Sequence, residues 1–108
     1  MPFNEQLANR IREQVKLFPE DFEEKRMFGG LTFLYQGKMT VGIVKEDLAV
    51  RIIAEKMGLE LAKDYVRPMD FTKKPMKEFV YVSQEGIKTE ERLLHFIELG
   101  LEHAKSKL

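Results

Sequence analysis

The residues best suited to contact another molecule are basic and lie together between positions 63 and 77. Five cations in this segment oppose two carboxylates, which gives a net charge of +3. The cations are Lys63, Arg67, Lys73, Lys74 and Lys77, and Arg51 in a nearby predicted strand can add to them. Guanidinium and ammonium groups bind carboxylates and phosphates. Three interpretations are open: a solvated loop, a surface for an acidic protein, and a surface for nucleic acid.

The histidines do not have the spacing of a metal site. His95 and His103 lie eight positions apart on one predicted helix, which places them about 12 Å apart along its axis. Two ligands at that distance cannot bind the same ion, and no further ligands complete either one. We therefore expect both histidines at the surface or at the helix end, with no metal and no cofactor.

Catalytic groups are equally hard to assemble from this sequence. Adjacent carboxylates fall in predicted links, turns or the first turn of a helix, where water solvates both members and does not push their pKa values apart. These pairs are Glu23-Glu24, Glu46-Asp47 and Glu90-Glu91. The chain has no cysteine, and Ser83 and Ser106 have no neighbouring base in any readable motif. We expect a protein that is not an enzyme.

Glycines and methionines have structural interpretations. Gly29-Gly30 precedes a predicted strand, whereas a phosphate-binding loop leads into a helix. We expect a bulge or a turn with positive φ between strands there. Gly42, inside a predicted strand, is expected to be a bulge or a close packing point. Met27, Met39, Met69 and Met76 at strand and loop ends are interpreted as core filling, with an adaptable binding groove as the alternative.

Composition indicates the number of domains, the type of partner and the cellular compartment. A chain of 108 residues, 44% of them hydrophobic, has the size of one domain that buries about two-thirds of its unfolded surface. Its 18 basic and 18 acidic residues balance, so only a local patch can attract a charged partner. The absence of cysteine, of a signal peptide pattern and of an apolar run near 20 residues indicates a soluble, cytoplasmic protein.

Hydrophobic periodicity predicts three helices and a meander of strands. Asn4 and Pro19 bound the first helix, residues 54–63 form the second, and Thr89 caps a third that buries Leu94, Ile97, Leu101, Ala104 and Leu108. Strands are expected over residues 25–28, 31–35, 39–44, 48–53 and 76–82, with an ordered loop over 65–75. Short connections require antiparallel pairing. We therefore predict an α+β, two-layer fold with an antiparallel sheet of about four to six strands.

Several short motifs, none specific alone, occur in a characteristic order. They are Met27-Phe28-Gly29-Gly30, Gly37-Lys38-Met39, Gly42, Val50-Arg51, Arg67-Pro68-Met69-Asp70-Phe71-Thr72 and Pro75-Met76-Lys77-Glu78-Phe79-Val80-Tyr81-Val82. From about Arg26 to the end, the chain resembles the N-terminal domain of the TfoX/Sxy competence regulators, particularly its short stand-alone members. The resemblance implies a two-layer α+β fold over residues 1–108 and, for the two-domain members, a role in switching on DNA-uptake genes. It carries over no catalytic residue.

These observations favour a regulatory module that binds a protein partner. The alternative is direct binding of nucleic acid through residues 63–77, and an enzyme with a small-molecule pocket is the least favoured. The basic residues named above, with Arg51, are the candidate binding residues. The family motif residues Met27, Phe28, Gly29, Gly30, Gly37, Gly42, Pro68, Met69 and Met76 are expected to be structural. No membrane contact is expected, and the partner and oligomeric state stay open.

Overall fold

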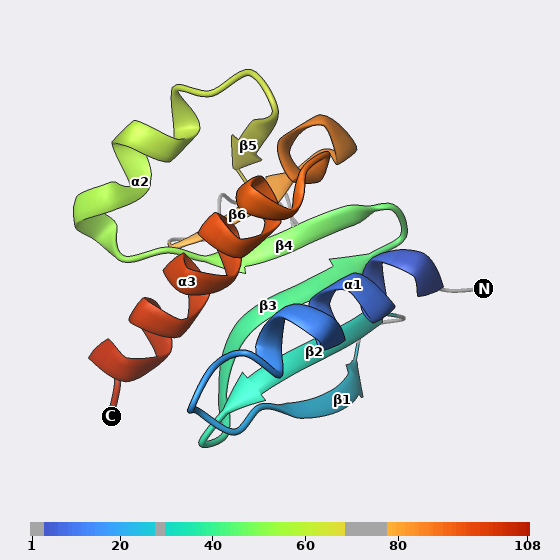
Figure 1. Ribbon diagram of the computed structural model, residues 1–108. Coiled ribbons are helices and arrows are strands. Elements are labelled where there is room, and N and C mark those ends of the chain that lie inside the picture. Colours follow the sequence, from blue (N-terminus) through green and yellow to red (C-terminus); the bar gives the residue numbers. More distant parts are fainter. Residues whose placement is uncertain (1–3, 28–29, 69–77) are drawn as a thin grey trace.

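A computed structural model describes residues 4–27, 30–68 and 78–108 (Figure 1). Its helices are α1 (Glu5–Val15), α2 (Ala54–Leu61) and α3 (Glu90–Ser106), with a short 3-10 helix η1 (Gln84–Ile87) before α3. Its strands are β1 (Glu23–Met27), β2 (Gly30–Tyr35), β3 (Lys38–Val44), β4 (Asp47–Arg51), β5 (Val66–Pro68) and β6 (Phe79–Val82).

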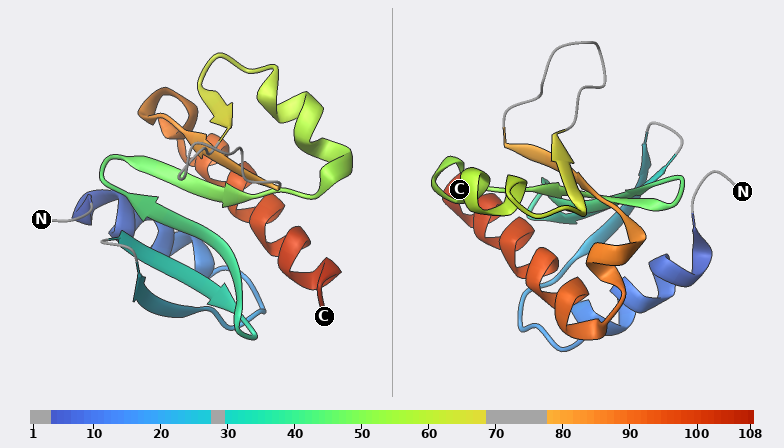
Figure 2. Two further views of the ribbon diagram at one scale, coloured as in Figure 1. Left: turned by 180° about the vertical axis from the view of Figure 1, so that it is seen from behind. Right: turned by 90° about the horizontal axis from the view of Figure 1, so that it is seen from above.

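The six strands form one antiparallel sheet in the order β1-β2-β3-β4-β6-β5. Helices α1 and α3 lie over one face of this sheet, and α2 lies beside α3 near β5 (Figures 1 and 2). No described helix lies over the opposite face. The predicted two-layer α+β fold, with helices near the start, middle and end of the chain, is confirmed.

Alternation along the strands builds the core between the helices and the sheet. Phe33, Val50, Val80 and Val82 are at most 1% exposed, and successive strand residues point to opposite faces. The sequence predicts Phe79 and Tyr81 on one face of β6 and Val80 and Val82 on the other. This is confirmed, because Val80 and Val82 enter the main core while Phe79 joins a small second cluster with Ala49.

The caps predicted from the sequence are present. Asn4 Oδ1 accepts a hydrogen bond from the Leu7 backbone nitrogen at 3.1 Å, and the Thr89 hydroxyl accepts one from the Arg92 nitrogen at 3.2 Å. Each cap satisfies a helical donor that has no partner within its helix. Both helices therefore begin where the sequence predicts.

The buried stripe of α3 was predicted only in part, because Ile97, Leu101 and Ala104 are buried but the other two predicted members are not. Leu94 is only half-buried and Leu108 is 61% exposed, whereas Leu93, Phe96 and Gly100 are buried. The sheet side of the helix follows positions 93, 96, 97, 100 and 104, which is also a 3.6-residue period. The predicted stripe began one residue too late and so left out Leu93 and Phe96. It also left out Gly100 and His103, because a glycine and a histidine were not counted as core.

A β-bulge at Thr40 fixes where α3 crosses the sheet. Phe33 is opposite Val41 and Leu34 is opposite Met39, so Thr40 is an extra residue on β3. Its hydroxyl donates a hydrogen bond to the Phe33 carbonyl at 2.9 Å. A Cβ at Gly100 would lie 2.5 Å from the Thr40 carbonyl oxygen. The helix can approach the bulge this closely only because position 100 has no side chain.

The glycines of the family motifs have different roles. Gln36 and Gly37 join β2 to β3 with φ values of 49° and 81°, as a two-residue hairpin turn requires. Gly42 is a close packing point, since a Cβ there would lie 3.1 Å from the Leu31 carbonyl oxygen. Gly30 begins β2, buried and opposite Met27. Phe28 and Gly29 lie outside the described residues, and so does the turn predicted there.

The prediction of a continuous loop over residues 65–75 is wrong at its start. Val66–Pro68 forms β5, which pairs with β6 through Val66 and Val82. Proline signals argued against a strand, but β5 is an edge strand, where a residue without an N–H is tolerated. Residues 69–77, which include Met69, Lys73, Lys74, Met76 and Lys77, lie outside the described residues. Within the described ranges, no helix is both long and apolar enough to cross a membrane.

Candidate functional site

The helix-free face of the sheet carries two arginines that lie over aromatic rings. Arg51 of β4 is directly opposite Phe79 of β6, and Arg67 of β5 is directly opposite Tyr81. The guanidinium carbon of Arg51 lies 4.1 Å from the Phe79 ring centroid, and that of Arg67 lies 5.0 Å from the Tyr81 centroid. Both distances allow cation–π attraction. Phe79 and Tyr81 are two residues apart, so the two stacks are neighbours on one face.

The two arginines differ in how their charge is balanced. Arg67 forms an ion pair with Asp47 of β4 at 2.5 Å. Arg51 is half-buried, and this burial lowers its pKa, against an opposing effect of the Glu78 charge. Among the described residues, no oxygen accepts a hydrogen bond from the Arg51 guanidinium. Arg51 therefore presents a positive charge with unused donors.

The structure does not bring all the predicted basic residues together. Arg51 and Arg67 share the helix-free face, but Lys63 lies on the helix side. Its Nζ is 2.8 Å from Glu60 Oε1 and 5.6 Å from the centroid of the Phe96 ring, which belongs to the core. Lys63 is thus separated from the two arginines by the sheet. Lys73, Lys74 and Lys77 lie outside the described residues.

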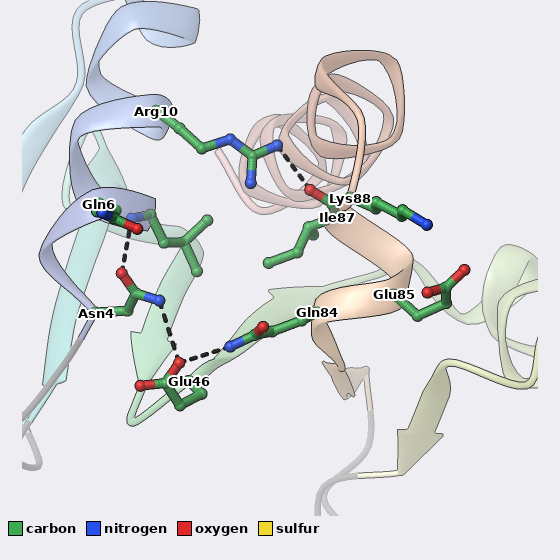
Figure 3. A pocket seen from close by; sticks show the side chains of 9 residues that line it. Asn4, Gln6, Arg10, Glu46, Gln84, Glu85, Ile87 and Lys88 are labelled. Carbon is green, nitrogen blue, oxygen red and sulfur yellow. Dashed lines mark hydrogen bonds between the residues drawn. The ribbon is translucent and has the colours of Figure 1, made fainter.

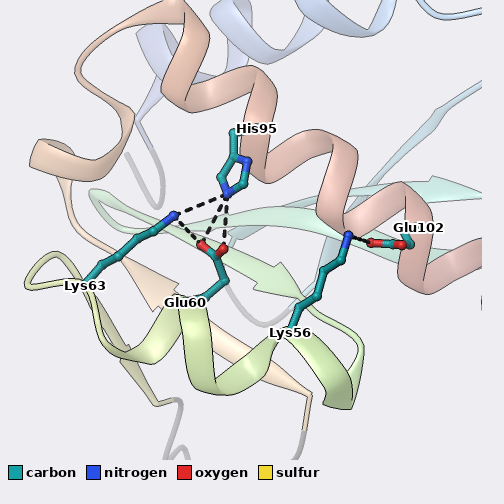
Figure 4. Close-up of polar contacts among 5 residues, drawn as sticks. All are labelled: Lys56, Glu60, Lys63, His95 and Glu102. Atoms are coloured by element: carbon teal, nitrogen blue, oxygen red, sulfur yellow. Dashed lines mark hydrogen bonds and ion pairs between the residues drawn. The ribbon is translucent and has the colours of Figure 1, made fainter.

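Lys63 belongs to a polar cluster that connects α2 with α3 (Figure 4). The side chain of Glu60 is only 7% exposed and accepts from Lys63, while His95 Nε2 lies 3.3 Å from both of its carboxylate oxygens. Lys56 and Glu102 form a second link of 2.8 Å between the same helices. A buried carboxylate is stable when cations and donors surround it, so this cluster has a structural role.

A polar pocket of about 370 Å³ lies where α1, the β3–β4 turn and η1 meet (Figure 3). Glu46 accepts hydrogen bonds from Asn4 at 3.2 Å and from Gln84 at 2.6 Å. Arg10 donates to the Ile87 carbonyl and to Glu90, each at 2.7 Å. Because these groups bond to one another, the pocket connects α1 to the rest of the molecule and offers few free donors to a ligand.

His103 lies in the last turn of α3, so the predicted position at the helix end is confirmed, but the residue is not at the surface. It is 3% exposed, and its Nε2 is 3.3 Å from Glu78 Oε1. Burial lowers the pKa of His103, and the contact with Glu78 opposes that effect. The same contact is the main reason why the pKa of Glu78 is lowered. The contact between His103 and Glu78 was not predicted from the sequence, because Glu78 precedes β6 in a charged stretch that resembles solvated surface.

His103 also lines a basic pocket of about 320 Å³ at the ends of β3, β4 and α3. Its lining residues are Lys38, Met39, Arg51, His103 and Lys107. Lys107 is 3.6 Å from Glu78. In the described part of the chain, no group of three or more histidine or carboxylate side chains is placed to hold a metal ion.

Comparison with known protein families identifies the relationship that the motifs indicated. The model of the TfoX N-terminal domain matches residues 13–104. The chain belongs to the TfoX N-terminal domain family. The match begins before Arg26 and includes the end of α1. No curated protein and no solved structure matches the chain. Membership of the TfoX N-terminal domain family indicates a regulatory module.

In this TfoX N-terminal domain, some motif residues lie on the helix-free face and others shape the sheet. Arg51 and Arg67 contribute the two stacked guanidinium groups. Pro68 lies in the edge strand opposite Val80, and Gly42 lets β3 pack closely against β2. The motifs thus include both residues that shape the sheet and residues that give its open face a positive charge.

Proposed function

We propose that this TfoX N-terminal domain is a non-catalytic regulatory module of the cytoplasm that binds an acidic protein through the helix-free face of its sheet. The observation that carries the proposal is the pair of arginines stacked on Phe79 and Tyr81. Arginine and aromatic residues are enriched in protein interfaces and provide much of their binding energy.

Packing gives these side chains a defined geometry before a partner arrives. Phe79 is 7% exposed and forms a small cluster with Ala49, to which Met39, Val44 and Tyr81 add apolar surface. A guanidinium group held over a ring loses less rotational freedom on binding than a free one. This favours a surface that binds with little rearrangement.

Charge favours an acidic partner. Asp47 balances Arg67, but Arg51 has no balancing hydrogen bond among the described residues. The lysines at positions 73, 74 and 77 belong to the segment that joins β5 to β6 in the chain. A carboxylate-rich protein segment can use the paired donors of Arg51 and be attracted by these lysines.

A binding role also agrees with how the acidic side chains are used. Glu46, Glu60 and Glu90 each accept hydrogen bonds from amides or cations of the protein itself. Carboxylates held in this way stabilise the fold and are poorly placed for proton transfer to a substrate. This supports binding over catalysis as the function of the module.

The proposal can be tested by affinity capture with charge-matched variants. The protein is immobilised and exposed to nuclease-treated lysate, as wild type, as Arg51→Gln/Arg67→Gln, and as the control Lys16→Gln/Lys88→Gln. Both double variants remove two positive charges, but Lys16 and Lys88 are exposed residues away from the helix-free face. Captured proteins are then purified and titrated against each variant by calorimetry.

We expect an acidic protein that binds the wild type and the control but loses about tenfold or more of its affinity for the arginine variant. Equal binding to all three proteins would contradict the proposal. Capture that disappears with nuclease, with affinity falling steeply as salt rises, would instead support nucleic acid as the partner.

A further inference from the structure

The basic pocket formed by Lys38, Met39, Arg51, His103 and Lys107 has a chemical character distinct from the other cavities. Three cations and one histidine line a volume of about 320 Å³. They come from three elements: Lys38 begins β3, Arg51 ends β4, and His103 and Lys107 lie at the end of α3. The convergence of separate elements on one cavity produces a local excess of positive charge.

The carboxylate of Glu78 balances only part of that charge. Glu78 Oε1 is 3.3 Å from His103 Nε2 and 3.6 Å from Lys107 Nζ. Its charge is therefore shared between these two residues at the end of α3, and it also acts on Arg51. This contact also satisfies a polar atom of His103, which is almost completely buried. The α3 side of the pocket is thus close to neutral.

The strand side of the pocket keeps its positive charge. In the described ranges, Lys38 and Arg51 have neither an ion pair nor a hydrogen bond through their side-chain nitrogens. Arg51 is held by the Phe79 ring at 4.1 Å, which leaves the edge of its guanidinium group free to donate. A half-buried cation without an acceptor is stabilised by any anion that reaches it.

We propose that this pocket binds a small dianion, of the kind found in phosphate monoesters and short dicarboxylates. Two cations without an ion pair in the described ranges match two negative charges, and the planar donors of Arg51 fit the paired oxygens of either group. Met39 supplies an adaptable apolar wall for the rest of the ligand. A cavity of about 320 Å³ fits a small molecule.

The dipole of α3 explains the position of the basic residue at the helix end but not the positions of the two cations from the strands. Cations near a helix C-terminus are favourable because they interact with the negative end of its dipole, and Lys107 occupies such a position. Lys38 and Arg51 come from strands, so the helix does not explain them. These two residues are the strongest test of a binding site.

The experiment titrates the whole protein with inorganic phosphate and, separately, with succinate, at constant ionic strength set by sodium chloride. Amide chemical shifts and the melting temperature are followed for the wild type, Lys38→Gln, Arg51→Gln and the control Lys16→Gln. Lys38 and Lys16 are both exposed, so their loss should leave folding intact and make them a matched pair.

We expect saturable shifts around the pocket with a dissociation constant on the order of 1 mM, weakened about tenfold by Lys38→Gln or Arg51→Gln and unchanged by Lys16→Gln. Tighter binding of phosphate than succinate would assign a phosphate ligand, and the reverse a dicarboxylate. Shifts that do not saturate, or equal binding by Lys38→Gln and Lys16→Gln, would overturn the proposal. Arg67→Gln should retain anion binding, because Arg67 does not line the pocket. This variant therefore tests the anion site independently of the proposed protein-binding face.

Discussion

The environment of His103 combines burial with a carboxylate and two cations. Its ring faces Glu78, while Arg51 and Lys107 lie close enough to oppose its protonation. Burial is the largest effect, so the pKa of His103 is lowered in the folded protein. The fold therefore favours a neutral imidazole, and the charge of Glu78 stabilises a protonated ring only in part.

This lowered pKa predicts that the folded protein loses stability as the pH falls. An unfolded His103 takes up a proton near its ordinary pKa of 6.5, whereas the folded residue does so only at lower pH. Between these two pKa values the unfolded state binds more protons than the folded state. The free energy of unfolding therefore decreases as the pH is lowered. We expect this decrease as the pH falls from about 7.5 through the ordinary pKa of 6.5 to more acid values.

Denaturant unfolding of the wild type and His103→Asn across that pH range measures the effect. The variant should lose part of the pH dependence, even where its stability at neutral pH is lower. The carboxylates with lowered pKa values, Glu20, Glu24, Glu78 and Glu90, have an ordinary value of 4.5, so their contribution begins at lower pH than that of His103. Parallel pH profiles for the two proteins would show that His103 is not responsible.

At the scale of elements, the position of α3 depends on its approach to the bulge of β3. The close distance between Gly100 and Thr40 allows Phe96, Ile97 and Ala104 to pack on the sheet. Alanine usually stabilises the interior of a helix by about 1 kcal/mol relative to glycine. At position 100 the added methyl group would instead enter the space of a backbone carbonyl.

We predict opposite effects of the same substitution in two helices. Gly100→Ala should destabilise the protein by about 1–3 kcal/mol, because the helix or the bulge must move. Gly58→Ala in α2 should stabilise it by about 0.5–1 kcal/mol, since a Cβ there meets no atom within 4 Å. Chemical denaturation measures both. Stabilisation by Gly100→Ala would mean that α3 does not lie this close to the bulge.

The elements also show what could be predicted from the sequence and why. Caps, hairpin turns and the alternation in β6 depend on neighbouring residues, so local patterns were sufficient. β5 was missed because only its pairing with β6 makes Val66–Pro68 a strand. The site was predicted less well: Arg51 and Arg67 do share a face, but Lys63 is separated from them, and the burial of Glu60 and His103 depends on contacts between distant parts of the chain.

At the scale of the whole molecule, the sheet has a protected centre and two different edges. β3 and β4 have a neighbour on each side and are covered by α3, whereas β5 contributes only three residues and β1 is an exposed edge. Backbone hydrogen bonds at such edges open more easily than those in the centre. Stability should therefore decrease outward from β3 and β4.

Hydrogen exchange provides the corresponding prediction. Amides of β3 and β4 that donate within the sheet should exchange slowest, close to the rate set by global unfolding, and those of β1 and β5 should exchange earlier through local opening. Residue-resolved exchange measured by NMR tests this order. Equal protection of β1 and β4 would indicate that the sheet opens as a single unit.

The order of strands in the sheet also affects how the protein can form during synthesis. β5 leaves the ribosome before β6, yet its one neighbour among the described strands is β6, which lies between β5 and β4. Until β6 emerges, the nascent chain therefore contains a β1–β4 meander whose last strand has an unpaired edge. Helix α3, which covers the core, follows later still. Because exposed edges and apolar faces promote aggregation, the interval between the synthesis of β4 and α3 is when this chain most needs a chaperone.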